Sequence, residues 1–287
     1  MRSFLFGLLL LLIPSSSLAS QSQVGLLVMA HGGNDNWNEA VREAVRPLAE
    51  KYPVAIAFGM ANPETLRSAV NDLKKKGVSS IAVVRLFVSA TSFLPETEYA
   101  FGLRTEKPSG QFMNEPEILG VEIPVILNSM GLLDASALGA VLADRSVALS
   151  TDPGRETVLI IGHGPASDVE NRKWLRKMNS LADSVRALTP FHSVLVRTLR
   201  EDWTGKRKLA ELELRDLIKT EAAHGRTVLV IPFRLYGFGP YSEVFEGLDY
   251  RSDGMAFLPD DRVTCWIENQ YLSLSETLRS GSANPAE

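Results

Sequence analysis

Two histidines occupy matching places in the chain and are the strongest candidates for chemistry. His31 lies in the run AHGG and His163 in the run GHGP, and each run directly follows an apolar stretch. Imidazole binds transition metals and exchanges protons near neutral pH. We expect Gly32 and Gly33 to let a ligand approach the backbone. The sequence therefore predicts a ligand site at these loops, with strand capping within the fold as the alternative role of both histidines.

A second duplicated motif supplies carboxylates. The pattern P-x-[ST]-E-x-x-x-G-L occurs twice, with Glu98 in the first copy and Glu243 in the second. A carboxylate and an imidazole together suit a divalent ion such as cobalt, nickel, iron or zinc, and both groups accept protons. The alternative role of each glutamate is a favourable charge at a helix N-terminus.

The elements around these motifs predict an α/β fold. Apolar runs predict strands at 24–30, 54–58, 81–88, 157–161, 193–199 and 227–231. Amphipathic helices are predicted between them, with starts at Asn34, Pro63 and Ser167 and a further helix over about 206–223. Strands that alternate with helices in this way form a parallel sheet with right-handed crossovers. Because ligands bind at the carboxyl ends of such strands, His31 and His163 are well placed for a site.

The order of elements repeats along the chain. We predict two duplicated lobes, 24–150 and 156–280, each a parallel sheet flanked by helices. The Asp-Pro-Gly sequence at 152–154 marks the boundary between them.

Composition excludes several classes of function. The 287 residues carry a net charge of −4 with the charges interspersed, so we expect no nucleic-acid partner. Cys265 is the single cysteine, which rules out an intrachain disulfide and a thiolate metal cage. The chain contains no P-loop, no GxGxxG fingerprint and no GxSxG elbow, so neither a nucleotide cofactor nor a serine hydrolase is expected.

Residues 1–19 have the pattern of a signal peptide. Arg2 precedes the apolar run Phe4–Ile13, and Ser17 and Ala19 fit the small-residue positions of a cleavage site. We expect cleavage after Ala19, a periplasmic or secreted protein, and no membrane span in the mature chain. An uncleaved membrane anchor is the alternative.

Three stretches resemble a known enzyme family: VGLLVMAHGG from Val24, ANPETL from Ala61 and IAVVRLF from Ile81. They are similar to the CbiX/SirB sirohydrochlorin chelatases, class II enzymes that insert cobalt or iron into a reduced tetrapyrrole without ATP during cobalamin or sirohaem biosynthesis. The resemblance covers most of residues 24–250. It implies the long form of the family, in which two fused chelatase-like lobes enclose a cleft, with a tetrapyrrole as substrate and cobalt, iron or nickel as the metal.

The resemblance also assigns roles to residues. His31 matches the metal-binding, proton-accepting histidine of the family, and His163 is its counterpart. The acidic residue that the family carries at the end of the second strand falls at about Gly59. The family's second histidine falls near Ser92 in the first half and near Gly239 in the second. The usual ligand set is therefore not intact in either half.

Two hypotheses follow for the function. In the first, the chain is a chelatase: His31, His163, Glu98 and Glu243 hold the metal, and His31 or Glu98 removes pyrrole protons. In the second, it is a non-catalytic exported protein that binds a metal or a tetrapyrrole.

Two arginines near the ends of matching strands are candidates for binding the macrocycle. Arg85 and Arg234 could pair with its carboxylates. A solvated charge at the strand end is the alternative role of each.

Overall fold

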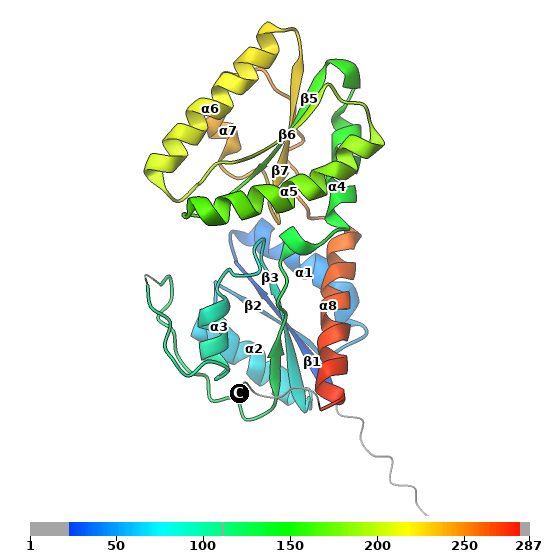
Figure 1. Ribbon diagram of the computed structural model, residues 1–287. Coiled ribbons are helices and arrows are strands. Elements are labelled where there is room, and N and C mark those ends of the chain that lie inside the picture. Colours follow the sequence, from blue (N-terminus) through cyan, green and yellow to red (C-terminus); the bar gives the residue numbers. More distant parts are fainter. Residues whose placement is uncertain (1–22, 111, 282–287) are drawn as a thin grey trace, which may run out of the picture.

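The computed structural model describes residues 23–110 and 112–281, which form two parallel sheets (Figure 1). The first sheet has the strand order β2-β1-β3-β4 and the second has the order β6-β5-β7. The strands are β1 (Val24–Ala30), β2 (Val54–Phe58), β3 (Ser80–Leu86), β4 (Val125–Leu127), β5 (Glu156–Gly162), β6 (Ser193–Thr198) and β7 (Thr227–Phe233). In each half the first strand is central, so the predicted α/β fold with two duplicated lobes is confirmed. The predicted signal peptide lies outside the described residues.

Helices cover both faces of each sheet. They are α1 (Asp35–Ala49), α2 (Pro63–Lys75), α3 (Leu94–Ala100), α4 (Leu138–Leu149), α5 (Asp168–Leu188), α6 (Thr204–Ala223), α7 (Tyr241–Val244) and α8 (Asp261–Arg279), with short 3₁₀ turns at Leu132–Asp134 and Pro153–Arg155. Three helices start where the sequence predicted. Asn34 accepts a hydrogen bond from the Trp37 N–H at 3.0 Å, and the side chains of Asn62 and Ser167 cap α2 and α5 in the same way.

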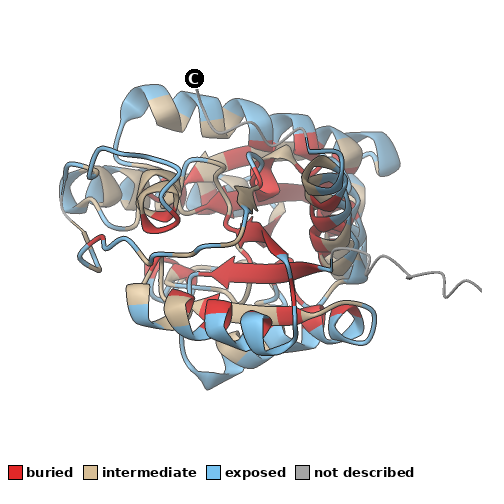
Figure 2. Cartoon of the chain, turned by 90° about the horizontal axis from the view of Figure 1, so that it is seen from below, coloured by how far each residue is buried: buried red, intermediate tan, exposed pale blue. Residues whose placement is uncertain are grey.

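The central strands are buried on both faces, which explains their unbroken apolar sequences. Every residue of β1 and of β5 is buried. Successive side chains of a strand point to opposite faces. Leu26 and Val28 accordingly belong to one apolar cluster, and Leu27 and Met29 to another. Figure 2 shows these buried strands between layers of helices whose outer faces are exposed.

The two lobes exchange one helix each, which corrects the predicted boundaries. Helix α4 precedes the second sheet in the chain and packs on α5 and β7, whereas α8 packs on α1, β1, β3 and β4 of the first lobe (Figure 1). Hydrogen bonds fix α8 there, from Thr264 Oγ1 to the Ala44 carbonyl at 2.7 Å and from the Tyr271 hydroxyl to the Val24 carbonyl at 2.9 Å. The ranges 24–150 and 156–280 therefore describe the sheets, but α4 belongs to the second lobe and α8 to the first.

One apolar cluster runs through both lobes. It includes Val28 of the first sheet, Ile160 of the second, and buried residues of α4 and α8. Because the exchanged helices join the two cores, packing sets the position of one lobe against the other. Within residues 23–110 and 112–281, no helix is long and apolar enough to span a membrane.

Candidate functional site

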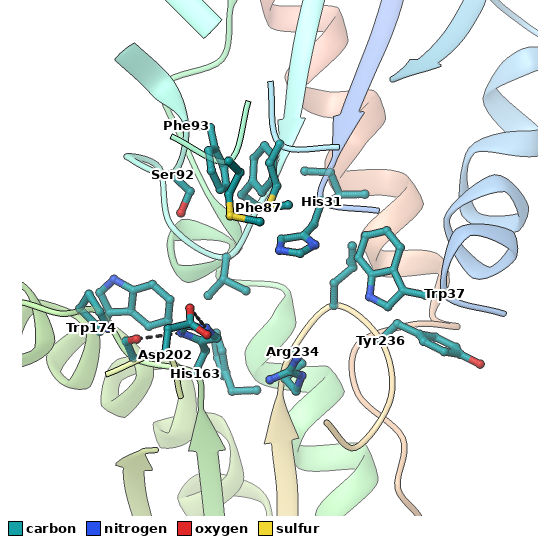
Figure 3. Close-up of a pocket in the computed structure, with 18 of the residues that line it drawn as sticks. His31, Trp37, Phe87, Ser92, Phe93, His163, Trp174, Asp202, Arg234 and Tyr236 are labelled. Atoms are coloured by element: carbon teal, nitrogen blue, oxygen red, sulfur yellow. Dashed lines mark hydrogen bonds and ion pairs between the residues drawn. The ribbon is translucent and has the colours of Figure 1, made fainter. Parts of the chain in front are cut away.

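The two His-Gly loops meet at one cavity between the lobes. The cavity has a volume of about 620 Å³, and both His31 and His163 line it (Figure 3). A volume of this size is typical of small-molecule sites, which span roughly 300–1,000 Å³. The tertiary structure therefore brings together two histidines that are far apart in the sequence.

The His31 ring is held from behind and faces the cavity. His31 follows the last residue of β1, and its carbonyl accepts a hydrogen bond from the Gly59 N–H at 3.0 Å. The ring Nδ1 lies 2.7 Å from the Gly32 carbonyl oxygen, a geometry in which Nδ1–H donates. The other nitrogen, Nε2, then carries a lone pair. His31 is exposed, and Trp37 packs beside it with a ring-centroid distance of 6.2 Å. Its Nε2 can therefore bind a metal or accept a proton.

His163 repeats this arrangement and adds a carboxylate. Its Nδ1 lies 2.8 Å from the Gly164 carbonyl oxygen, and its own carbonyl accepts the Arg200 N–H at 2.7 Å. Nε2 lies 3.0 Å from Oδ2 of Asp202, and the Trp203 ring packs edge-on at 5.8 Å. Both ring nitrogens thus face acceptor oxygens. A hydrogen on Nδ1 therefore meets the Gly164 carbonyl, and a hydrogen on Nε2 meets the Asp202 carboxylate.

A half-buried ion pair lies on the same side of the cavity. Nη1 of Arg234 lies 2.5 Å from Oε1 of Glu201, and the Tyr241 hydroxyl donates to the same oxygen at 3.1 Å. Burial raises the pKa of Tyr241 well above its usual range, so it stays neutral and acts as a donor. The Arg234 side chain is 26% exposed and lines the cavity. Of the two arginines that the sequence suggested for substrate binding, Arg234 is placed to do so.

Aromatic rings make up much of the remaining wall. Trp37, Trp174, Trp203, Phe87, Phe93 and Tyr236 all line the cavity (Figure 3). Flat aromatic surfaces stack well on a planar conjugated ligand. Sequence reasoning did not assign these residues to the site. Trp37 follows the His31 loop and Trp203 follows β6, so the two tryptophans do not hold equivalent positions in the repeat.

A strained turn shapes the first lobe's side of the cavity. Gly59, Met60 and Ala61 have consecutive φ angles of +108°, +56° and +60°, a region that non-glycine residues adopt only at a cost. Asn114 donates from Nδ2 to the Gly59 carbonyl at 2.7 Å and so pins the following loop to the turn. Met60 and Met113 both line the cavity as a result.

The comparisons with known proteins agree with this geometry. Residues 25–97, from β1 into α3, match the CbiX family model. The structure is similar to SirB from Bacillus subtilis with Fe³⁺, with a TM-score of 0.61 and 16% identity over 92% of this chain and 100% of that one. It is also similar to the sirohydrochlorin chelatase SirB from Bacillus subtilis subspecies spizizenii in complex with cobalt, with a TM-score of 0.57 and 13% identity over 89% and 96% of the two chains. The fold is CbiX/SirB-like. No curated protein matches the chain in sequence.

The second lobe carries two carboxylates in the turn that corresponds to the acidic position of the CbiX/SirB pattern. Ala30 pairs with Phe58 and Gly162 with Thr198, so the turn after β6 corresponds to the turn after β2. Leu199 matches Gly59 in this register, and Glu201 and Asp202 lie two and three residues further along the turn. Sequence reasoning sought the acidic residue in the first half alone and so missed Asp202, although Glu201 and Asp202 follow the predicted strand after one intervening residue.

Glu98 and Glu243 do not join the histidines, which corrects the predicted ligand set. Neither glutamate lines the cavity. Oε2 of Glu98 pairs with Nε of Arg104 at 3.2 Å, and Glu243 is exposed in the first turn of α7. The helix-start role fits Glu243, which lies in the first turn of α7, but not Glu98, because the acidic residue in the first turn of α3 is Glu96. Among the described residues, no group of three or more His, Cys, Asp or Glu side chains is arranged to hold a metal ion.

Arg85 supports the fold, which corrects its predicted role in substrate binding. Its residue surface is 1% exposed, and it does not line the cavity. The guanidinium donates to the carbonyls of Ser92 at 3.0 Å, Ala90 at 2.7 Å and Asn128 at 2.9 Å. Burial lowers the pKa of Arg85. The side chain thus organises the loop after β3, and through that loop it places Phe93 at the cavity.

Gly32 and Gly33 also serve the fold, and neither lines the cavity. Gly32 has a φ of +82°, and a Cβ there would lie 3.2 Å from Cβ of Phe58. A Cβ on Gly33 would lie 3.0 Å from the Trp37 ring. The close approach that these glycines permit is to the protein's own residues, so their predicted contact with substrate needs correction.

Proposed function

We propose that this protein is a metal chelatase that binds a tetrapyrrole between its lobes and inserts a divalent metal ion. One observation carries the proposal: His31 and His163, at equivalent strand ends of two CbiX/SirB-like lobes, face a single cavity with aromatic walls. A planar macrocycle in this cavity would have an imidazole on each side. The resemblance implies a sirohydrochlorin-type tetrapyrrole. The number of carboxylates on the macrocycle is a separate question, which depends on the charges that line the cavity.

In this proposal His31 receives the metal, which is a substrate of the reaction. Its Nδ1–H donates a hydrogen bond to the Gly32 carbonyl. This hydrogen bond orients the ring and leaves the lone pair of Nε2 to bind the metal. The SirB structures with Fe³⁺ and with cobalt support a first-row transition metal. Cobalt, iron and nickel are the candidates because imidazole suits all three.

His163 and Asp202 would accept protons. Insertion of a divalent ion forms bonds to the pyrrole nitrogens and displaces two protons from them, so the site needs acceptors. Nε2 of His163 lies 3.0 Å from the Asp202 carboxylate, so a proton can pass between these two groups, while Nδ1 lies 2.8 Å from the Gly164 carbonyl. The first lobe would thus bind the metal, and the second lobe would accept the protons.

A second candidate function is a non-catalytic exported protein that binds a metal or a tetrapyrrole. It is favoured by the lack of a group of three or more His, Cys, Asp or Glu side chains arranged for a metal among the described residues. Such a protein would bind the macrocycle on the aromatic wall without metal insertion.

The proposed location is the periplasm or the exterior of the cell. The pattern of residues 1–19 supports export, since Arg2, the apolar run and Ala19 have the order of a cleavable signal peptide. Mass spectrometry of the exported protein should find an N-terminus at Ser20. Retention of Met1 in a membrane fraction would contradict this location.

Metal insertion by histidine variants tests the chelatase proposal. The absorbance of a free-base tetrapyrrole is followed after addition of Co²⁺, with His31→Ala and His163→Ala compared with the parent. We expect His31→Ala to lower the insertion rate by about 100-fold, the scale of losing a positioned acid–base or ligand group. Both variants should keep the parent's melting temperature because neither side chain lies in the core.

Two variants serve as controls. His224→Ala removes an exposed histidine at the end of α6, and Glu98→Gln removes a carboxylate outside the cavity. Both should insert metal at the parent's rate. If His31→Ala and His163→Ala also match the parent, the chelatase proposal fails. Binding of the macrocycle without insertion by the parent would support the second candidate.

A further inference from the structure

The cavity has little positive charge to offer a ligand. Among the described residues that line it, Arg234 is the one Lys or Arg, and Asp202 contributes a carboxylate. The Arg234 guanidinium is already paired with Glu201 at 2.5 Å. Its neighbour Tyr241 donates to the same Glu201 oxygen and leaves that carboxylate well satisfied. The polar side of the cavity is therefore close to neutral before any ligand enters.

Basic side chains on the neighbouring turns are committed elsewhere. Arg200 donates to the Pro165 carbonyl at 2.5 Å and to Asp168 at 3.0 Å, and Lys206 also pairs with Asp168. Arg85 is bound by three backbone carbonyls. Recruiting any of these cations for a ligand would break a contact that holds the loops around the cavity.

The aromatic wall favours an apolar ligand over a highly charged one. Three tryptophans line the cavity, together with Phe87, Phe93 and Tyr236 (Figure 3). An apolar ring system gains by burial against these faces. A carboxylate placed against the ring faces loses its hydration without gaining a cation.

We infer that the cavity is specific for a planar conjugated macrocycle with few carboxylates and discriminates against one with carboxylates around its whole rim. Arg234 uses Nη1 for Glu201, so its remaining N–H groups can still bind one acid group, and water at the mouth of the cavity can solvate another. A macrocycle with acid groups on every pyrrole ring must direct several of them at Trp37, Trp174 and Phe93. This inference rests on the proposed function because it names the substrate class for the same cavity.

A porphyrin series that varies in charge tests the inference. Deuteroporphyrin, coproporphyrin and uroporphyrin share one ring system and carry two, four and eight carboxylates. Dissociation constants for the full chain are measured from the shift of the porphyrin absorption band. We expect affinity to fall in that order, with deuteroporphyrin bound at least about tenfold more tightly than uroporphyrin. Equal affinities, or the reverse order, would overturn the inference.

Two matched variants tie the result to this cavity. Ser92 lines the wall, so Ser92→Lys adds a cation there and should tighten uroporphyrin binding, whereas Ser92→Gln adds similar bulk without charge and should not. Trp174→Ala should weaken deuteroporphyrin binding. If Trp174→Ala has no effect, the porphyrin binds elsewhere and the inference is overturned.

Metal insertion, measured with the same three porphyrins, separates this inference from the chelatase proposal. Preferential binding and metallation of uroporphyrin would overturn the inference and leave the chelatase proposal standing. Preferential binding of deuteroporphyrin without metallation of any porphyrin would support the inference and contradict the chelatase proposal. If no porphyrin binds, both fail.

Discussion

Replacing Gly164 with alanine tests how the His163 loop is built. Gly164 has a φ of +76°, where an alanine costs about 1–2 kcal/mol. Its Cβ would also lie 2.6 Å from Cβ of Thr198 and 2.9 Å from Cδ of Arg200. Thr198 is held by a hydrogen bond from Oγ1 to Asn171 at 2.8 Å, so it yields little. Overpacking of this kind adds about 1–3 kcal/mol. We expect Gly164→Ala to lower the free energy of unfolding by ~2–5 kcal/mol.

Gly247→Ala is the matched control for this variant. Gly247 lies in the same lobe with a φ of +73°, and a Cβ there would meet nothing within 4 Å. Its substitution should therefore lower the free energy of unfolding only by the cost of an alanine at positive φ, ~1–2 kcal/mol. Urea unfolding of both variants, followed by circular dichroism, gives the difference, which we expect to be ~1–3 kcal/mol. Equal losses in the two variants would refute the steric argument and would leave the space beside Gly164 open to a ligand.

Two further substitutions test roles that the structure assigns. Arg85→Met should lower the free energy of unfolding by about 3 kcal/mol or more because it leaves buried carbonyls, including that of Asn128, without a donor; a variant that melts like the parent but binds tetrapyrrole poorly would instead favour the substrate-binding role. Hydrogen bonds from Arg226 lower the pKa of Glu221 from 4.5 to about 2, so this carboxylate contributes stability above pH 4.5 and loses it as the pH falls towards 2. Urea unfolding across pH should find Glu221→Gln less stable than the parent at pH 7, with a difference that shrinks between pH 4.5 and 2; a constant difference would contradict the linkage.

Much of the fold could be predicted because its signals are local. The strands over residues 24–30 and 54–58 match the predicted bounds. The first is buried on both faces and must therefore be continuously apolar, and the second is a short apolar edge strand. Helix starts at Asn34 and Ser167 were correct for the same reason, because a capping side chain acts on N–H groups two or three residues away. The duplication followed from the repeated order of these elements.

The candidate site could be predicted only in part. The two histidines were found because each directly follows an apolar run, and the end of such a run marks the end of a strand in the structure. Asp202 was missed because its importance comes from a contact with His163 across two parallel strands. Arg85 and Arg234 occupy similar places in the sequence, yet one is enclosed by loop carbonyls and the other opens onto the cavity.

The sequence by itself determined the α/β class, the repeat and the two His-Gly loops, since each depends on residues close together in the chain. The tertiary structure decided which helices complete which lobe, because the contacts of α8 with α1, β1, β3 and β4 join segments that are far apart in the chain. It also decided that Glu98 and Glu243 stay outside the cavity while Asp202 and three tryptophans line it. Side chains that are distant in the sequence meet only through packing, and local periodicity carries no record of that packing.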